Sequence, residues 1–390
     1  MWENCKDIQD YIVTLRRDLH QIPELAKELP KTQEYIAKEL DRLGISYKKN
    51  KNDSGIIGEI KGGHSGKTIL FRADIDALPI QEDTGVAYCS KHDGYMHACG
   101  HDAHAAMLLG ALRILQENRE NLNGNVKFVF QSSEEQLKGA SVAIEEGALE
   151  NVDAVFGTHI GSILDPNIPS GKLIVVPGCC MASADRFVLN IKGVGCHGSS
   201  PEKGVDPVTI ASNIVLALQT VIAREISALH SGVLTIGKIS GGFSYNVIPN
   251  NVEIEGTIRT LDANIRRYIA KRVEEIAKSV AATFRGSCDV EIDWGAPPVI
   301  NNEEMAEFAA NTAKKILGED EVITSMPGPN MGGEDFAYYA EQKPSVFMFL
   351  SSSNPEKQTN IPHHNPKFNI DEDVLYKGSA MFVALAEDFL

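Results

Sequence analysis

Thr68-Ile-Leu-Phe-Arg-Ala73 is a short apolar run, and similar runs alternate with helical stretches along much of the chain. The other runs are residues 126–131, 154–158 and 345–350, and the helical stretches are residues 103–118, 138–147 and 303–317. This alternation is typical of a sheet that is covered by helices on both faces. We therefore predict an α/β domain built on these strands.

Residues 8–44 precede this pattern and read as two helices. Ile12, Leu15 and Leu19 mark the apolar face of the first helix. Thr32 precedes the second helix, which is predicted to end near Gly44.

The middle of the chain follows a different order of elements. Strands are predicted at residues 185–192, 233–239, 251–260 and 287–293, and long helices at residues 206–227 and 262–284. The resulting β-α-β-β-α-β order is the ferredoxin-like pattern, which makes a complete small α+β domain. We expect residues 184–296 to form an inserted domain, so that residues 1–183 and 297–390 make up one discontinuous domain, with Pro297-Pro298 at the return crossing.

Composition and charge exclude several classes of protein. The 390 residues are 43% hydrophobic, which is enough for a large core, and the net charge of −16 would repel a phosphate backbone. We therefore expect no nucleic-acid partner. The first eleven residues are charged, and no later segment has eighteen uninterrupted apolar residues, so we expect a cytoplasmic protein without a membrane partner. Seven scattered cysteines fit a reducing compartment better than a disulfide framework.

A dense group of metal-binding residue types stands at the start of a predicted helix, in His97-Ala-Cys-Gly-His-Asp-Ala-His104. Imidazole, thiolate and carboxylate all bind divalent ions such as zinc, and Cys99-x-His101 offers two donors from one turn. The alternative is a polar helix start beside a buried thiol. One turn cannot complete a metal site, so further donors must come from other segments.

The further candidates lie where predicted strands end. Glu134-Glu135 follow the strand at residues 126–131, and His159 ends the next strand. Paired glutamates are often only solvated, and His159 could be a hydrogen-bonded core residue. His363 and His364 follow the last strand in a proline-braced loop. Asp74 and Asp76 follow the strand that ends at Ala73, and we expect them to orient a metal-binding imidazole rather than to bind the metal.

The inserted domain carries three more candidates. His197 is predicted in a flexible polar loop after a strand. Asn246 and Arg259 supply an amide and a guanidinium that could hold a substrate carboxylate, although either residue could equally be structural.

Together these motifs resemble the aminoacylase, hippurate hydrolase and auxin-conjugate amidohydrolase branch of the two-domain zinc-type metallopeptidases. The matching segments run in the family's order: residues 16–24, 72–79, 96–104, 134–135, 157–159, 195–197, 246–249, 333–336 and 364–368. The resemblance therefore covers nearly the whole chain. It implies a mixed-sheet catalytic domain with an inserted ferredoxin-like lid and dimerisation domain.

The resemblance also implies roles for individual residues. The metal ligands would be Cys99, His101, Glu135, His159 and His364, which are enough for two divalent ions (Zn, Mn, Co or Ni) per subunit. His364 is favoured over His363 because the family has a His-x-Pro spacing. Glu134 would be the general base. His197 would reach the active site of the partner subunit in a homodimer built through the inserted domain, and Asn246 and Arg259 would hold the carboxylate end of the substrate.

Two differences from the family leave substrate preference open: Cys196 stands where many relatives have Gly, and Ser132-Ser133 stand where Pro-Ala is frequent. The resemblance implies hydrolysis of N-acyl amino acids to a carboxylic acid and a free amino acid. The nearest alternative is a dipeptidase or carboxypeptidase with the same two metals. A non-catalytic binding protein and a thiol redox protein are less favoured, because Glu134 is intact and the chain has no Cys-x-x-Cys pair.

Overall fold

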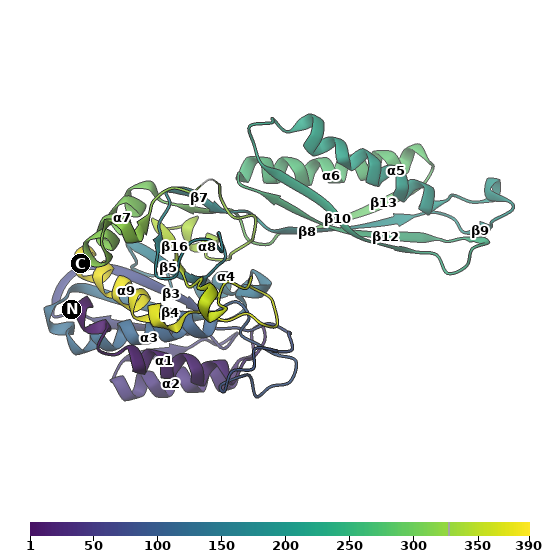
Figure 1. The fold of residues 1–390 in the computed structure, drawn as a ribbon. Coiled ribbons are helices and arrows are strands. Elements are labelled where there is room, and N and C mark those ends of the chain that lie inside the picture. The colour runs from purple at the N-terminus through teal and green to yellow at the C-terminus, as the bar shows by residue number, and fades with distance from the viewer. Residues whose placement is uncertain (327) are drawn as a thin grey trace. The chain divides into compact units, whose positions relative to one another are not determined.

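The chain divides into two compact units, which are described separately. The computed structural model describes residues 1–326 and 328–390. The first unit contains Met1–Cys180, Val299–Asn330 and Asp335–Leu390, and the second contains Met181–Pro298 and Met331–Glu334. Figure 1 shows the elements of each unit along the chain.

A large mixed sheet forms the centre of the first unit. Its strands are β1 (Ser46–Lys49), β2 (Ile56–Lys61), β3 (His64–Asp74), β4 (Asn123–Gln131), β5 (Ala154–Gly161), β6 (Leu173–Ile174), β15 (Val322–Ile323) and β16 (Ser345–Ser351). They follow the order β1-β2-β4-β3-β5-β16-β6-β15, and the four central strands β4, β3, β5 and β16 are parallel. The predicted α/β fold class is confirmed. The short strands β7 (Gly178–Met181) and β14 (Val299–Asn301) pair separately.

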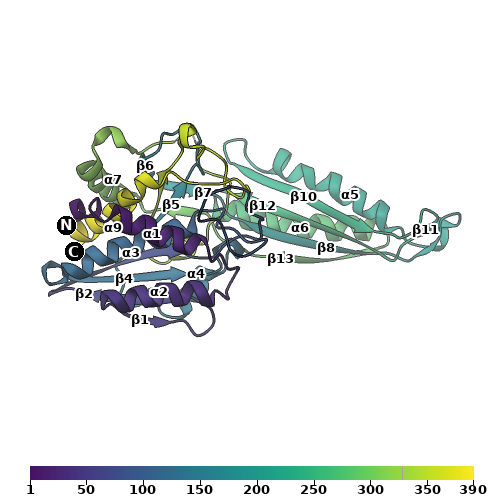
Figure 2. The same ribbon diagram turned by 60° about the horizontal axis from the view of Figure 1, so that its bottom comes forward.

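Helices cover both faces of this sheet. They are α1 (Gln9–His20), α2 (Pro30–Leu43), α3 (His101–Glu117), α4 (Gly139–Glu145), α7 (Glu303–Leu317), α8 (Ala337–Ala340) and α9 (Leu375–Phe389). The helices α3, α7 and α9 lie over one face, where Phe71 of β3 packs on Phe382 of α9. Figure 2 shows the two chain ends side by side in this unit, where the Met1 amino group pairs with Glu387 at 2.9 Å.

Helix α2 begins earlier than predicted. It starts at Pro30, whose fixed φ suits the first helical position, and not after Thr32. The Glu24 carboxylate accepts hydrogen bonds from the backbone N–H groups of Lys31 and Thr32 at 3.0 and 2.9 Å. A side chain six residues before the helix therefore satisfies two of its free N–H groups, and Pro30 is the local signal for this start.

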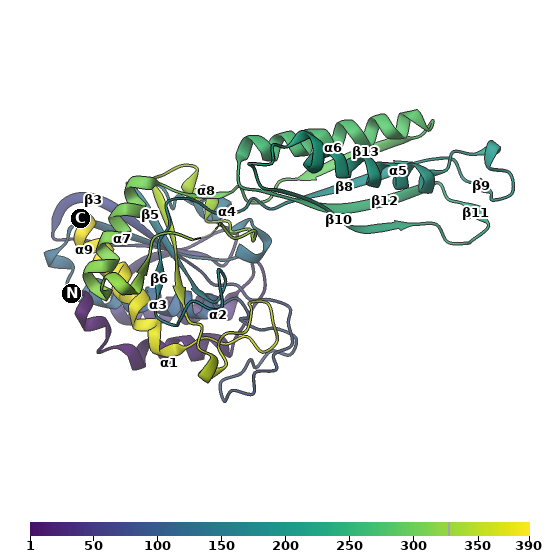
Figure 3. The same cartoon turned by 45° about the horizontal axis from the view of Figure 1, so that its top comes forward.

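The second unit has the predicted β-α-β-β-α-β order. Its elements are β8 (Asp185–Lys192), α5 (Pro207–Thr220), β10 (Gly232–Gly241), β12 (Asn251–Thr260), α6 (Ala263–Thr283) and β13 (Ser287–Asp293). The strands form one antiparallel sheet in the order β10-β12-β8-β13. Figure 3 shows α5 and α6 together on one face of this sheet, where they bury a compact apolar core.

Helix α5 differs from the prediction at its end. The predicted helix over residues 206–227 ends at Thr220, and a wider π-helical turn follows at Val221–Glu225. Within the described residues, Pro207–Glu225 has the length and composition of a membrane span, and 33% of its most apolar window is buried. Ile210, Ile214 and Leu218 recur on one buried face, as in an amphipathic helix of a globular domain, so this is weak support for a span.

Candidate active site

Three parallel strands deliver polar side chains to the same edge of the large sheet. The register pairs Asp74 at the end of β3 with Gln131 at the end of β4, and β5 runs parallel beside β3. Glu134 and Glu135 follow β4, and His159 lies near the end of β5. Residues that are distant in the sequence therefore meet at one edge, as expected for the carboxyl ends of parallel strands.

Cys99 and His101 reach this edge from the start of α3. Gly100 lies between them with a φ of 92°, a left-handed conformation that glycine adopts without strain. The Nδ1 atom of His101 donates to the backbone carbonyl of Asp76 at 2.9 Å. This contact fixes the ring and leaves its Nε2 lone pair directed toward the other donors.

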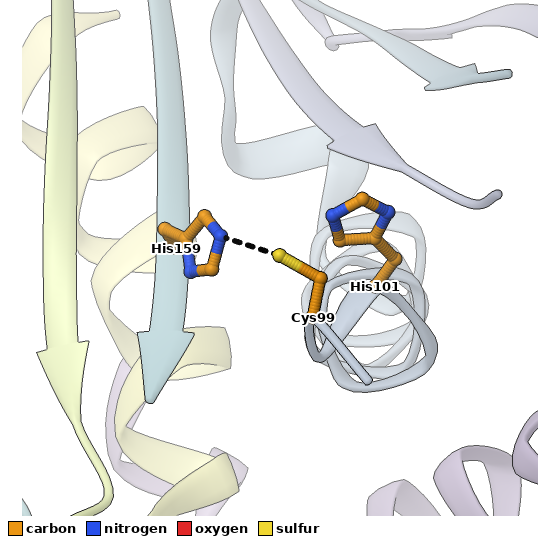
Figure 4. A group of neighbouring side chains, drawn as sticks. All are labelled: Cys99, His101 and His159. Atoms are coloured by element: carbon orange, nitrogen blue, oxygen red, sulfur yellow. Dashed lines mark hydrogen bonds between the residues drawn. The ribbon is translucent and has the colours of Figure 1, made fainter. Parts of the chain in front are cut away.

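The donor atoms of the predicted ligands converge in two groups that share Cys99. Cys99, His101 and His159 form one group, and Cys99, Glu135 and His364 form the other, with the donor atoms of each group within 4.8 Å of one another. Figure 4 shows His159 on its strand facing Cys99 and His101 at the helix start, with 3.4 Å between the Cys99 Sγ and the His159 Nε2. The Nε2 of His364 lies 3.5 Å from the Glu135 Oε1.

The chemistry of this donor set fits divalent metal ions. Among the described residues, the His101 Nε2 is buried without a hydrogen-bond partner, and it lies 4.0 Å from the Glu135 Oε1. Buried polar atoms are rarely left unsatisfied, so this nitrogen fits the role of a metal ligand. Hydrogen bonds to Cys99 and Glu135 raise the pKa of His364 to about 10.

The neighbouring His363 lies outside both donor groups. Its Nε2 donates to the Ile160 carbonyl at 3.1 Å, and its ring packs on Phe368 with 4.6 Å between ring centroids. Gly161 makes room for this ring, because a Cβ at that position would lie 2.1 Å from the His363 Nε2. The structure therefore places His364, and not its rival, beside Glu135.

Glu134 and Glu135 are held by an aspartate of the neighbouring strand end. The two carboxylate oxygens of Asp76 accept the backbone N–H groups of Glu134 and Glu135, each at 3.1 Å. A carboxylate oxygen of Glu134 then lies 3.9 Å from the His101 Nε2, and the Glu134 side chain is buried. The Asp76 carboxylate thus orients the two glutamates, whereas the expected role was to orient a metal-binding imidazole.

A buried polar network beneath the site could not be predicted from sequence. His104 donates from Nδ1 to Asp74 at 2.5 Å and accepts the Ile160 N–H at Nε2 at 2.8 Å, so neither nitrogen is available to a metal. Arg72 pairs with Asp74 at 2.8 Å and with Asp335 at 2.7 Å. Asp335 lies 263 positions from Arg72, and the only sequence signal was its place in the Gly333-Glu-Asp-Phe336 motif.

The remaining candidates lie in the second unit, where the structure corrects one expectation. His197 is not in a flexible loop: β9 (Cys196–His197) pairs with β11 (Val247–Ile248), and Val247 stands opposite His197. His197 and Asn246 are both exposed on this two-stranded element. Arg259 lies at the other end of β12, where Ile258 pairs with Asp185. Eight residues of strand, about 26 Å, separate Asn251 from Arg259, so Asn246 and Arg259 do not meet within one chain.

Fold and site together define an α/β enzyme with candidate metal donors at one edge of its large sheet. The family model for "Peptidase family M20/M25/M40" matches residues 70–388. The chain belongs to this family, which confirms the predicted family resemblance, and it is a metal-dependent amidohydrolase.

Curated relatives and solved structures match over nearly the full chain. The chain is 40% identical to an N-acetyl-L-cysteine deacetylase of Bacillus subtilis, over 99% of this chain and 90% of the relative. It is 38% identical to the IAA-amino acid hydrolase ILR1-like 2 of Arabidopsis thaliana, over 98% and 86%. It is 36% identical to the thermostable carboxypeptidase 2 of Saccharolobus solfataricus, over 99% and 97%. The Bacillus subtilis YXEP protein, a dinuclear metal-binding peptidase of the M20 family, has a TM-score of 0.83 at 35% identity, with 98% of both chains covered.

Proposed function

We propose that this enzyme hydrolyses the amide bond of N-acyl amino acids and releases a carboxylic acid and a free amino acid. The observation that carries the proposal is the convergence of the two donor groups on Cys99, with Glu134 next to them. The names of the deacetylase and the IAA-amino acid hydrolase support the same substrate class for this chain.

The site is proposed to hold two divalent ions. Cys99 would be shared, His101 and His159 would complete one position, and Glu135 and His364 would complete the other. When bound, such ions polarise an amide carbonyl and lower the pKa of a coordinated water toward about 7. The donors suit zinc, manganese, cobalt or nickel.

Glu134 is proposed to be the general base. Asp76 holds its backbone N–H, and its carboxylate points toward the His101 Nε2 at 3.9 Å, so it faces the donor set rather than bulk solvent. From this position it can take a proton from the attacking water and deliver it to the leaving amine.

His197 is proposed to donate a hydrogen bond to the developing oxyanion. The Ser199 N–H donates to the His197 Nδ1 at 3.1 Å, which places the proton of a neutral ring on Nε2. The exposed ring of one subunit would act on the substrate bound to the partner subunit, where it would stabilise negative charge in the transition state.

A homodimer through the inserted domain, residues 184–296, follows from this arrangement. Several large apolar side chains of the second unit are exposed, among them Leu216 at 70%, Phe243 at 83% and Tyr245 at 100%, and exposed apolar patches mark interaction surfaces. Asn246 and Arg259 lie at opposite ends of β12, so they could hold one substrate carboxylate only if Asn246 came from the partner. The inserted domain is thus proposed to serve as lid and dimerisation domain of a cytoplasmic enzyme.

The second candidate is a dipeptidase or carboxypeptidase that uses the same site. A dipeptide presents the same amide to the same donors, and one relative is named a carboxypeptidase. The two substrate classes differ in one group: a dipeptide carries a free α-amino group on its acyl side, and an N-acetyl or N-benzoyl amino acid does not.

The experiment that separates them is a substrate panel assayed at defined metal concentration. It compares N-acetyl and N-benzoyl amino acids with dipeptides that have the same C-terminal residue. The proposal predicts a higher kcat/KM for the N-acyl compounds. Faster hydrolysis of dipeptides would favour the second candidate, and no hydrolysis of any amide would overturn both.

A further inference from the structure

The segment Arg16–Glu24 near the chain start has no part in the proposed chemistry, yet it contacts the segment that carries two of the metal donors. Arg16 and His20 lie on the buried side of α1, and both side chains reach Asp102 in the first turn of α3. Asp102 directly follows the proposed ligand His101. The contacts at Asp102 therefore bear on how this ligand is oriented.

Asp102 receives two cationic groups at one carboxylate oxygen. The Arg16 Nε lies 2.9 Å and the His20 Nδ1 lies 2.7 Å from its Oδ2. The three side chains are almost completely buried, with exposed fractions of 1%, 2% and 0% for Arg16, His20 and Asp102. The His20 contact is a hydrogen bond, whereas the Arg16 contact is an ion pair, because among the described residues the Arg16 Nε has no hydrogen-bond partner.

The second nitrogen of His20 makes a separate contact. Its Nε2 lies 3.3 Å from the Glu82 Oε1, and the other Glu82 oxygen accepts the Ser90 N–H at 2.6 Å. Both ring nitrogens therefore face carboxylates. One imidazole thus joins the start of α3 to the long segment between β3 and α3.

Apolar packing alone could hold α1 against α3 without the desolvation penalty of buried charges. Burying an ion pair seldom adds net stability over well-packed apolar residues, because desolvation offsets the attraction. What such a pair does add is a fixed geometry. Successive helical residues project about 100° apart, so holding the Asp102 side chain also fixes the direction in which His101 projects.

We propose that Asp102, held by Arg16 and His20, is a positioning residue that sets the orientation of the Cys99 and His101 donors toward the metal ions. This inference rests on the proposed metal site. The Glu82 contact is secondary: it secures the covering segment and leaves the metal donors unchanged.

Substitutions of His20 separate the two contacts. Asn places an amide N–H close to the position of the imidazole Nδ1, so H20N keeps the Asp102 contact and loses the Glu82 contact. Gln reaches the Nε2 position, so H20Q keeps the Glu82 contact and loses the Asp102 contact, and H20L loses both. The matched control is D18A, on the same helix as His20, which removes a hydrogen bond of 2.8 Å from the Tyr35 hydroxyl of α2 without touching α3.

The measurement is the dissociation constant for zinc, obtained by competition with a chelating indicator, together with the urea midpoint of each metal-free variant. Loss of a supporting contact at a metal site typically weakens affinity by about 10- to 100-fold. We expect this loss in H20L and H20Q, near wild-type affinity in H20N, and a lower urea midpoint with unchanged affinity in D18A.

The outcomes distinguish this inference from the proposed function. Unchanged zinc affinity in H20L and H20Q would overturn the positioning role alone, as would equal losses in H20N and H20Q. If H20L does not fold, the comparison of H20N with H20Q still decides. A wild-type protein that binds no zinc would overturn the metal site itself, and the inference with it.

Discussion

The donor site of the first unit and the β9–β11 element of the second unit show two ways of presenting a functional histidine. In the first unit, His101 and His159 are buried, and a backbone carbonyl fixes the Nδ1 of each ring at 2.9 Å. On β9, His197 is exposed, and its ring nitrogen accepts a hydrogen bond from the backbone N–H of Ser199, two positions along the chain.

The difference indicates which of these histidines has the contacts that its proposed role needs within one chain. The buried rings have their supporting contacts in the same fold, so their proposed role as metal ligands needs no second chain. The exposed ring has a defined tautomer but no second surface within its own unit. Its proposed role therefore needs the partner subunit, whereas the role of the buried rings does not.

Metal removal should have the largest effect and should act only on the buried site. Incubation with a chelator should reduce amide hydrolysis to background, because it removes the Lewis acid that would polarise the carbonyl and lower the pKa of the water. Added zinc or manganese should restore it, as measured by release of free amino acid. A sample shown by elemental analysis to be metal-free, and yet fully active, would rule out the donor site.

Substitution of the proposed base should follow in size. E134Q keeps the shape of the side chain but cannot take a proton, so we expect kcat to fall by about 100- to 10,000-fold with the metal content unchanged. The matched control is E304Q in the first turn of α7, where the carboxylate is exposed and distant from the donor set. Near wild-type turnover by E134Q would remove Glu134 from the mechanism.

Mixing two inactive variants sharpens the comparison between the units. If His197 acts on the partner subunit, random exchange between H197A and E134Q dimers gives mixed dimers with one intact site each. About a quarter of the wild-type activity should then return, since half of the dimers are mixed and half of their sites are complete. Verified subunit exchange without recovery of activity would place His197 in its own subunit or outside the reaction.

The smallest expected effect concerns the packing behind the donors. Gly161 has a φ of 128°, and a Cβ added there would lie 2.1 Å from the His363 ring. Gly318 also has a positive φ, of 100°, but a Cβ added there would lie in open space, so G318A is the matched control. We expect G161A to lower the free energy of unfolding by about 1–3 kcal/mol more than G318A does, measured in urea. Equal losses would mean that the His363 ring moves aside freely.

The sequence predicted the fold through its local patterns. The apolar runs in β3, β4, β5 and β16 could be recognised as strands because these strands are buried on both faces. The β-α-β-β-α-β order of the second unit could be recognised in the same way from its alternating patterns. Shorter elements were missed: β6 and β9 have two residues each, too few for any periodicity. The predicted start of α2 was wrong because Pro30 marks the first helical position and the capping side chain, Glu24, lies outside the helix.

Candidate site residues could be predicted where a motif marked them, but their supports could not. Cys99 and His101 stand in a dense motif, whereas the contact from Arg72 to Asp335 joins positions far apart in the chain. The choice between His363 and His364 rested on the family spacing alone. Only the fold shows that one ring packs on Phe368 while the other lies beside Glu135.

The central claim is that one edge of the large sheet holds two metal ions. Anomalous diffraction from crystals grown with zinc, recorded on both sides of the zinc absorption edge, tests it most directly. The account predicts two peaks about 3.5–4 Å apart, bound by Cys99, His101, Glu135, His159 and His364. Full-occupancy zinc bound elsewhere, with this donor set empty, would contradict it.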